Sequence, residues 1–299
     1  MKLQAAIDQL YRQCREFGHC AVLLDTQAGT PLPDSVARLD EGCVPRLFLR
    51  DPLFANAPTE APMLLRVPAR EFLLIEELAT LAQKEATDPH RSLRSICAFI
   101  ASDLSGVQLA TRLARALDLR VEGRSFYFRY FDPRVFHHLP HLIAPPGLGC
   151  LLRGVAQWSY FLWDGSLLVR QIPECGPSMP DRPNLTIREW QMFETIEHFN
   201  ATQRLFARQG LRFEPTQTLD LFGLVHAARS LGIRAPEDTA YYLACSHHLP
   251  EALSRHPAWP SVMELLAQEA PLADALAHLC GVSIARLAPH RSLQPEQMP

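Results

Sequence analysis

The densest group of potential metal ligands in the chain is the run His137-His138-Leu139-Pro140-His141. On an unbroken helix His137 and His141 would share a face, as the two histidines of zinc proteases do. Position 138, however, holds histidine where that motif needs glutamate, and Pro140 breaks a helix between the two ligands. We therefore expect no bound metal and no other cofactor. A hydrolase or metalloenzyme that uses His137, His138 and His141 remains the alternative.

Other motifs that would indicate an enzyme are absent or incomplete. The sequence has no G-x-S-x-G nucleophile elbow and no Walker A loop. Gly147-Leu148-Gly149 lacks the third glycine of a dinucleotide loop and follows two prolines rather than a strand. Cys245, His247 and His248 form a weaker cluster, typical of a helix end that carries imidazoles. These observations favour a protein that is not an enzyme.

The eight cysteines show no C-x-x-C pair and no regular spacing. Several lie in apolar surroundings, such as Cys97 in Ile96-Cys97-Ala98-Phe99. We expect free, buried thiols in a reduced cytoplasm rather than a disulfide framework. A cysteine nucleophile stays open, because its histidine partner need not be near in sequence. The cysteines are Cys14, Cys20, Cys43, Cys97, Cys150, Cys175, Cys245 and Cys280.

Residues 125–134 concentrate aromatic side chains and end in Asp132-Pro133-Arg134. Their pattern predicts a strand over 126–131 that is apolar on both faces and therefore buried in the centre of a sheet. Asp132 and Pro133 then suit the N-cap and the first residue of a helix. Arg129 lies in the middle of this strand, where a guanidinium needs a carboxylate. An internal salt bridge and a partner protein are the two candidates for it.

Composition describes an ordinary soluble protein. Hydrophobic residues make up 47% of the chain and charged residues 20%, with a net charge of −3. This charge argues against a general nucleic-acid-binding surface. We expect no membrane insertion, because the longest stretch without charged residues holds prolines and glycines. Asp8, Arg12, Arg15 and Glu16 interrupt the apolar core that a signal peptide needs, so we expect a cytoplasmic protein.

Hydrophobic periodicity separates a mixed first part from a helical second part. We predict a mixed α/β lobe with a central sheet over residues 1–172, a proline-rich linker over 173–185, a helical lobe over 186–287 and a flexible tail over 288–299. Strands are expected at 19–25, 63–67, 95–101, 126–131, 157–163 and 166–172, the last two joined by an Asp164-Gly165 turn. Helices are expected at 3–17, 68–85, 105–117, 132–140 and, after the linker, at 186–204, 218–231, 236–248, 259–269 and 271–280.

The segment Phe128–Val135 closely resembles the signature of the type VI secretion effector chaperones, an adaptor family first catalogued as a domain of unknown function. Weaker similarity runs from about residue 20 to about residue 280. It includes Ala61-Pro62-Met63-Leu64-Leu65, Gln157-Trp158, Trp163-Asp164-Gly165, Leu231-Gly232-Ile233 and His256-Pro257-Ala258-Trp259-Pro260.

This resemblance implies a two-lobed, non-enzymatic adaptor. Such a protein binds a toxin effector, at its N-terminal region, keeps it soluble and loads it onto the valine-glycine-repeat (VgrG) spike protein. On that basis Arg129, Arg134 and Tyr130 are candidates for partner contacts, the arginines as carboxylate-binding anchors. The structural signature comprises Phe126, Phe128, Asp132 and Pro133. A purely structural assembly subunit is a further alternative.

Overall fold

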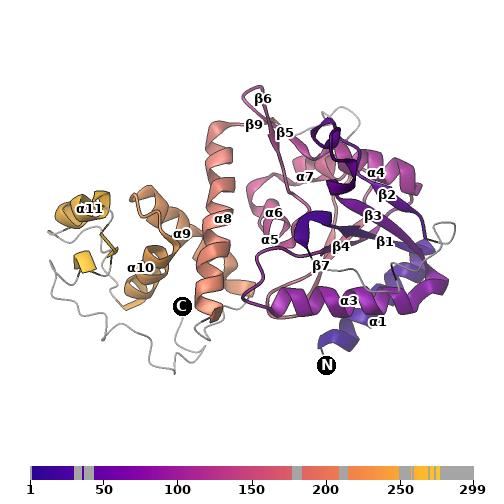
Figure 1. Cartoon of the computed structure of the whole chain (residues 1–299), viewed down its shortest axis with the longest axis horizontal. Coiled ribbons are helices and arrows are strands. Elements are labelled where there is room, and N and C mark those ends of the chain that lie inside the picture. Colours follow the sequence, from indigo (N-terminus) through magenta and orange to yellow (C-terminus); the bar gives the residue numbers. More distant parts are fainter. Residues whose placement is uncertain are drawn as a thin grey trace. The chain divides into compact units, whose positions relative to one another are not determined.

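The computed structural model describes residues 2–29, 36, 44–176, 184–208, 215–248, 257, 259–268, 270–272 and 274–276. The chain divides into two compact units, Met1–Phe193 and Glu194–Pro299. Of the predicted linker, residues 177–183 lie outside the described part, as do the predicted tail and residues 273 and 277–280 of the predicted helix 271–280. The mixed α/β class of the first part and the helical class of the second are confirmed (Figure 1).

The first unit is built on a six-stranded antiparallel sheet with strand order β2-β3-β1-β4-β7-β8. Apolar runs form its centre, and every residue of β1 and β4 is buried. The turn expected at Asp164-Gly165 joins β7 to β8, with Gly165 at φ 79°. The strands are β1 (His19–Leu24), β2 (Arg46–Phe48), β3 (Met63–Pro68), β4 (Ile96–Ala101), β7 (Gln157–Phe161) and β8 (Leu167–Gln171).

Two long helices, α1 (Lys2–Phe17) and α3 (Phe72–Thr87), cover one face of this sheet (Figure 1). Their apolar stripes pack with side chains of β1, β3 and β4 into one core cluster, in which Leu10, Leu65 and Ile75 are fully buried. The other face carries α4 (Gly106–Arg115) and the short helices α5 (Pro133–Phe136), α6 (Leu139–Leu142) and α7 (Pro145–Leu151). The predicted capping box at the start of α4 is present, with Ser105 and Gln108 each accepting from the other's backbone N–H.

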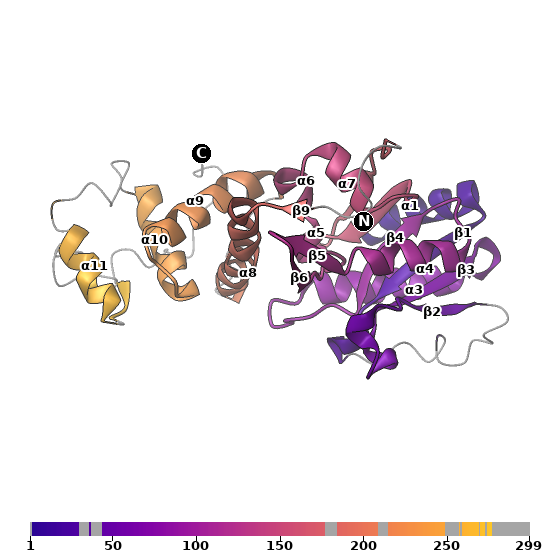
Figure 2. The same cartoon turned by 90° about the horizontal axis from the view of Figure 1, so that it is seen from above.

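A second, three-stranded sheet with order β6-β5-β9 belongs to the same unit (Figure 2). Strands β5 (Asp118–Val121) and β6 (Arg124–Tyr127) form a hairpin, and β9 (Asn184–Leu185) pairs with β5 in parallel. Helix α8 (Ile187–Arg208) follows β9 directly, after the predicted capping box of Thr186 and Glu189. Sequence periodicity did not predict this second sheet, because its strands are only two to four residues long.

The described part of the second unit is helical. It holds the remainder of α8, then α9 (Thr218–Ser230), α10 (Pro236–His248) and α11 (Trp259–Ala267), close to the predicted bounds. Its own core cluster includes Ala228, Ile233, Val262 and Leu272. Short 3-10 turns complete the chain at η1 (Thr26–Ala28), η2 (Pro52–Phe54), η3 (Pro58–Glu60), η4 (Ala69–Glu71) and η5 (Pro215–Gln217).

In the part of the chain that the structure describes, no helix is both long enough and apolar enough to cross a membrane.

Candidate functional site

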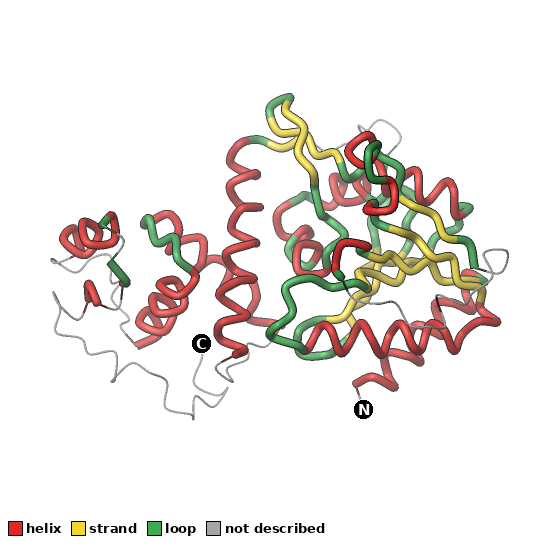
Figure 3. Tube along the Cα trace, in the orientation of Figure 1, coloured by secondary structure: helices red, strands yellow, loops and turns green. Residues whose placement is uncertain are grey.

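Residues 125–134, here called the signature segment, form a strand over only two of the six residues predicted at 126–131. Strand β6 ends at Tyr127, and residues 128–131 form an extended stretch and a turn (Figure 3). The predicted central strand over 126–131 is therefore wrong beyond Tyr127, and β6 lies in the small sheet. The physical reason is that Phe128 makes the last ladder bond, to the Leu117 carbonyl at 2.8 Å, and the chain then turns so that Asp132 N–H bonds the Arg129 carbonyl.

The aromatic rings of the segment reach the core through this turn instead. Phe128, Tyr130 and Phe131 are buried, and Phe136 of α5 stacks on Trp158 of β7 at 4.7 Å between ring centroids. The hydroxyl of Tyr130 donates to the Leu113 carbonyl at 2.9 Å, and the side chain is fully buried. Tyr130, which the sequence resemblance made a candidate for partner contacts, is therefore a core residue in this structure.

The two other rings of the segment are not buried as predicted. Phe126 is half-buried and packs against Trp190 at the start of α8, with ring centroids 4.6 Å apart. Tyr127 points to the opposite face of the hairpin, where it contacts Phe54 and remains 37% exposed. Strand β6 thus has one covered face and one partly solvated face, as in many antiparallel hairpins.

The predicted helix start at Asp132-Pro133 is confirmed. The Asp132 carboxylate accepts the backbone N–H of Arg134 at 3.0 Å, and Pro133 opens α5. The single predicted helix over 132–140 is instead two short helices, because Pro140 lies in the first turn of α6, where a proline is tolerated, rather than ending a helix.

Both arginines of the segment have carboxylate partners inside the first unit. Arg129 pairs with Asp25, which follows β1 and lies 104 residues away in sequence. The Arg129 guanidinium also lies over the Phe131 ring and keeps 26% of its side chain exposed. Burial raises the pKa of Asp25, and the charge of Arg129 and the Gln27 N–H oppose that rise only in part.

Asp132 and Arg134 form the second pair, with two hydrogen bonds of 2.9 and 2.5 Å to the two carboxylate oxygens. Both side chains are largely buried. Burial opposes ionisation of Asp132, but the bonds from Arg134 outweigh it and lower the carboxyl pKa. A bidentate pair of this kind stabilises the first turn of α5 and leaves little of either charge for chemistry.

Two further buried ions complete this charged region. Arg94 donates to the Phe161 carbonyl at 2.7 Å, and burial together with the charge of Arg134 lowers its pKa to about 10. Glu85 accepts from the Ser95 N–H at 2.8 Å and pairs with Arg91 at 2.8 Å. Each of these ions thus has a partner, either an opposite charge or, for Arg94, a backbone carbonyl, which indicates a structural network.

The histidine run does not form a metal site in the described residues. His137 lies 3.1 Å from the Tyr160 hydroxyl, and both it and His138 are buried. Burial lowers the pKa of His137 to about 4 and that of His138 to about 3. Across the described part of the chain no three histidine, cysteine, aspartate or glutamate side chains converge as metal ligands would. The side chains of Cys245, His247 and His248 lie outside the described residues.

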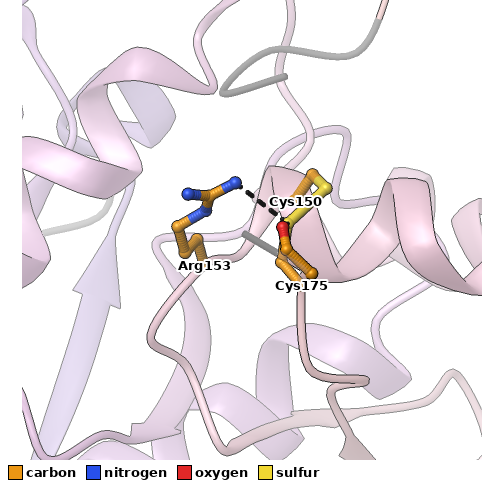
Figure 4. The surroundings of a disulfide bond; sticks show 4 residues. Cys150, Arg153 and Cys175 are labelled. Carbon is orange, nitrogen blue, oxygen red and sulfur yellow. Dashed lines mark hydrogen bonds between the residues drawn. A yellow bond between two sulfur atoms is a disulfide. The ribbon is translucent and has the colours of Figure 1, made fainter. Parts of the chain in front are cut away.

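The cysteines contain one pair that the sequence did not indicate. Cys150 in α7 and Cys175 after β8 form a disulfide, with Cα atoms 5.0 Å apart (Figure 4). The expectation of free thiols is therefore wrong for this pair and is confirmed for Cys14, Cys20 and Cys97, which are free and buried. No spacing motif marks the pair, because 25 residues separate its members and the fold brings them together.

The segment after β8 also crosses α7 closely. A Cβ atom at Gly149 would lie 2.4 Å from the Pro173 carbonyl oxygen, so only glycine fits here. The guanidinium of Arg153 lies 3.0 Å from the Cys175 sulfur, beside the disulfide (Figure 4). Residues 173–175 are thus held against α7 by a close backbone contact and a covalent bond.

Comparison with known protein families adds one finding. Residues 21–148 match the model of a family described as a domain of unknown function, DUF4123. The matched residues include Asp25, the whole signature segment and the histidine run, and they lie within the first unit. No curated protein and no solved structure matches the chain.

Proposed function

We propose that the protein is a cytoplasmic, non-enzymatic adaptor that binds the N-terminal region of a type VI secretion toxin, keeps it soluble and delivers it to the VgrG spike protein. The observation that carries this proposal is the signature Phe128–Val135, which resembles the effector chaperones and lies inside residues 21–148, where the DUF4123 model matches. No comparable signal points to a catalytic class.

The arrangement of the signature residues supports an adaptor over an enzyme. Asp132 and Arg134 bond each other, Arg129 bonds Asp25, and the neighbouring histidines are buried with lowered pKa values. A catalytic acid or base must reach a substrate and exchange protons near neutral pH. Groups that are paired in the interior instead maintain the shape of the surface around them, which is what a binding protein requires.

The direct test is co-expression with a candidate toxin taken from the genes that neighbour the gene of this chain. We expect the toxin to remain soluble and to co-purify with the adaptor, because binding covers apolar surface that would otherwise aggregate. Deletion of the adaptor should lower both the soluble toxin and the amount secreted. A second pull-down with the VgrG spike protein, in the presence and absence of toxin, tests the delivery step.

Two results of these experiments would contradict or narrow the proposal. If the toxin is equally soluble and equally secreted without this chain, and the two never co-purify, the adaptor function is wrong. Toxin that co-purifies but never reaches the spike protein would restrict the proposal to a chaperone.

A further inference from the structure

The β5–β6 hairpin has a defined hydrogen-bond pattern. Its two-residue turn, Glu122-Gly123, has φ angles of 47° and 81°, as in the tight turns that suit a twisted hairpin. Val121 pairs with Arg124 next to this turn, and bonded pairs recur at every second position along such a ladder. Phe128, four residues after Arg124, donates its N–H to the Leu117 carbonyl, so the bonded positions of β6 and of the residue that follows it are 124, 126 and 128.

The alternation of bonded and non-bonded positions determines which backbone groups of β6 face away from β5. Arg124 and Phe126 direct their N–H and C=O groups toward β5, so those of Ser125 and Tyr127 point to the outer edge. Strand β6 is the terminal strand of its sheet. In the described residues no hydrogen bond is found for the outward groups of Ser125 or Tyr127. The outer edge of β6 is therefore open to another strand.

The side chains beside this edge are apolar and cationic. Tyr127 is 37% exposed and rests on Phe54, whose neighbour Leu53 is 54% exposed. Arg120 and Arg124 are exposed, and within the described part of the chain neither has a carboxylate partner. A strand that added here would meet aromatic surface on one face and an unpaired guanidinium on the other.

We propose that an extended, acidic segment of the cargo toxin adds as a strand to the outer edge of β6. Its backbone bonds the N–H and C=O groups of Ser125 and Tyr127. Directly opposed residues share a face, so a carboxylate opposite Arg124 and an apolar residue opposite Tyr127 complete the match. This inference rests on the adaptor function and names the surface at which it operates.

A pair of substitutions at Ser125 tests the proposal. Ser125→Pro removes one outward N–H and leaves the β5–β6 ladder intact, because that N–H does not point toward β5. Ser125→Ala keeps the N–H and is the matched control. Each variant is co-expressed with the toxin and purified. Ser125→Pro should co-purify at least about ten-fold less toxin than the wild type, whereas Ser125→Ala should co-purify as much toxin as the wild type. Melting curves check that both variants are folded.

A charge variant covers the case in which Ser125→Pro does not fold. Arg124→Glu leaves the backbone unchanged and should weaken binding about ten-fold, with a smaller loss of affinity in high salt than the wild type shows. If Ser125→Pro is folded and binds the toxin as tightly as the wild type, the edge-strand inference is wrong. If Ser125→Pro does not fold, the same result for Arg124→Glu overturns the inference. In either case the adaptor function is unaffected. A wild-type chain that does not bind the toxin would overturn the adaptor function itself.

Discussion

The carboxylate of Asp132 has two roles in one position. It caps the first turn of α5 and it neutralises Arg134, a largely buried guanidinium close to the buried Arg94. A cap alone contributes about 1 kcal/mol, whereas removal of one member of a buried ion pair costs about 3–5 kcal/mol. The second role therefore dominates the stability of this site.

We expect Asp132→Ala to lower the free energy of unfolding by about 3–5 kcal/mol. Asp51→Ala is the control, because Asp51 caps η2 through the Leu53 N–H at 3.0 Å and has no arginine partner among the described residues. That variant should lose about 1 kcal/mol. Denaturant titration measures both, and equal losses would show that the pair with Arg134 contributes nothing.

The buried histidines make stability depend on pH. An unfolded histidine takes up a proton near pH 6.5, but the pKa is about 4 for folded His137 and about 3 for folded His138. Between these values the unfolded chain binds more protons, so stability falls as the pH decreases from about 6.5 to about 4. Each histidine contributes a slope of up to about 1.4 kcal/mol per pH unit.

Replacement of both histidines should reduce that slope. We expect His137→Gln with His138→Gln to flatten the pH dependence of the melting temperature between pH 6.5 and 4, even if stability at pH 7 is lower. His90→Gln, at an exposed position, should leave the profile unchanged. An unaltered profile in the double variant would mean that other groups cause the acid sensitivity.

At the scale of elements, local signals predicted much of the fold. Apolar runs located β1 and β4, the Asp164-Gly165 turn located the β7–β8 hairpin, and two capping boxes located the starts of α4 and α8. Each of these signals acts over a few residues, where the sequence determines hydrogen bonds and burial directly.

What the sequence did not predict depends on distant contacts. Arg129 meets Asp25 across 104 residues, and Cys150 meets Cys175 across 25. Alternation of aromatic residues favoured a strand over 126–131, but a turn buries Tyr130 and Phe131 equally well. Such choices are made by tertiary packing, which overrides local preference.

The disulfide gives a prediction for the segment after β8. Reduction should destabilise the protein by about 3 kcal/mol, because the bond closes a loop of 25 residues. Peptide mapping without reductant should recover Cys150 and Cys175 in one linked species. Cys175→Ser is the control, since its stability should not respond to reductant. A wild-type melting temperature that is equal with and without reductant would contradict the prediction.

At the scale of the whole molecule, each unit has its own core. Leu65 is fully buried in the core of the first unit and Leu272 in that of the second. We expect Leu65→Ala and Leu272→Ala to cost about 2–5 kcal/mol each, and each to act mainly on its own unit. Hydrogen exchange should therefore accelerate chiefly within residues 2–193 for the first variant and within 194–276 for the second. Equal acceleration throughout would indicate a single cooperative unit.

The closed ion pairs of the signature segment have a consequence for protein engineering. Asp25 and Asp132 neutralise Arg129 and Arg134 within the first unit, so the segment keeps its shape without help from a ligand. Arg124 and Ser125 of β6 are exposed, whereas Phe126 packs on Trp190 and Tyr127 on Phe54. Exchanging Arg124 and Ser125 for the residues of another chain that carries the same segment should therefore leave the scaffold intact.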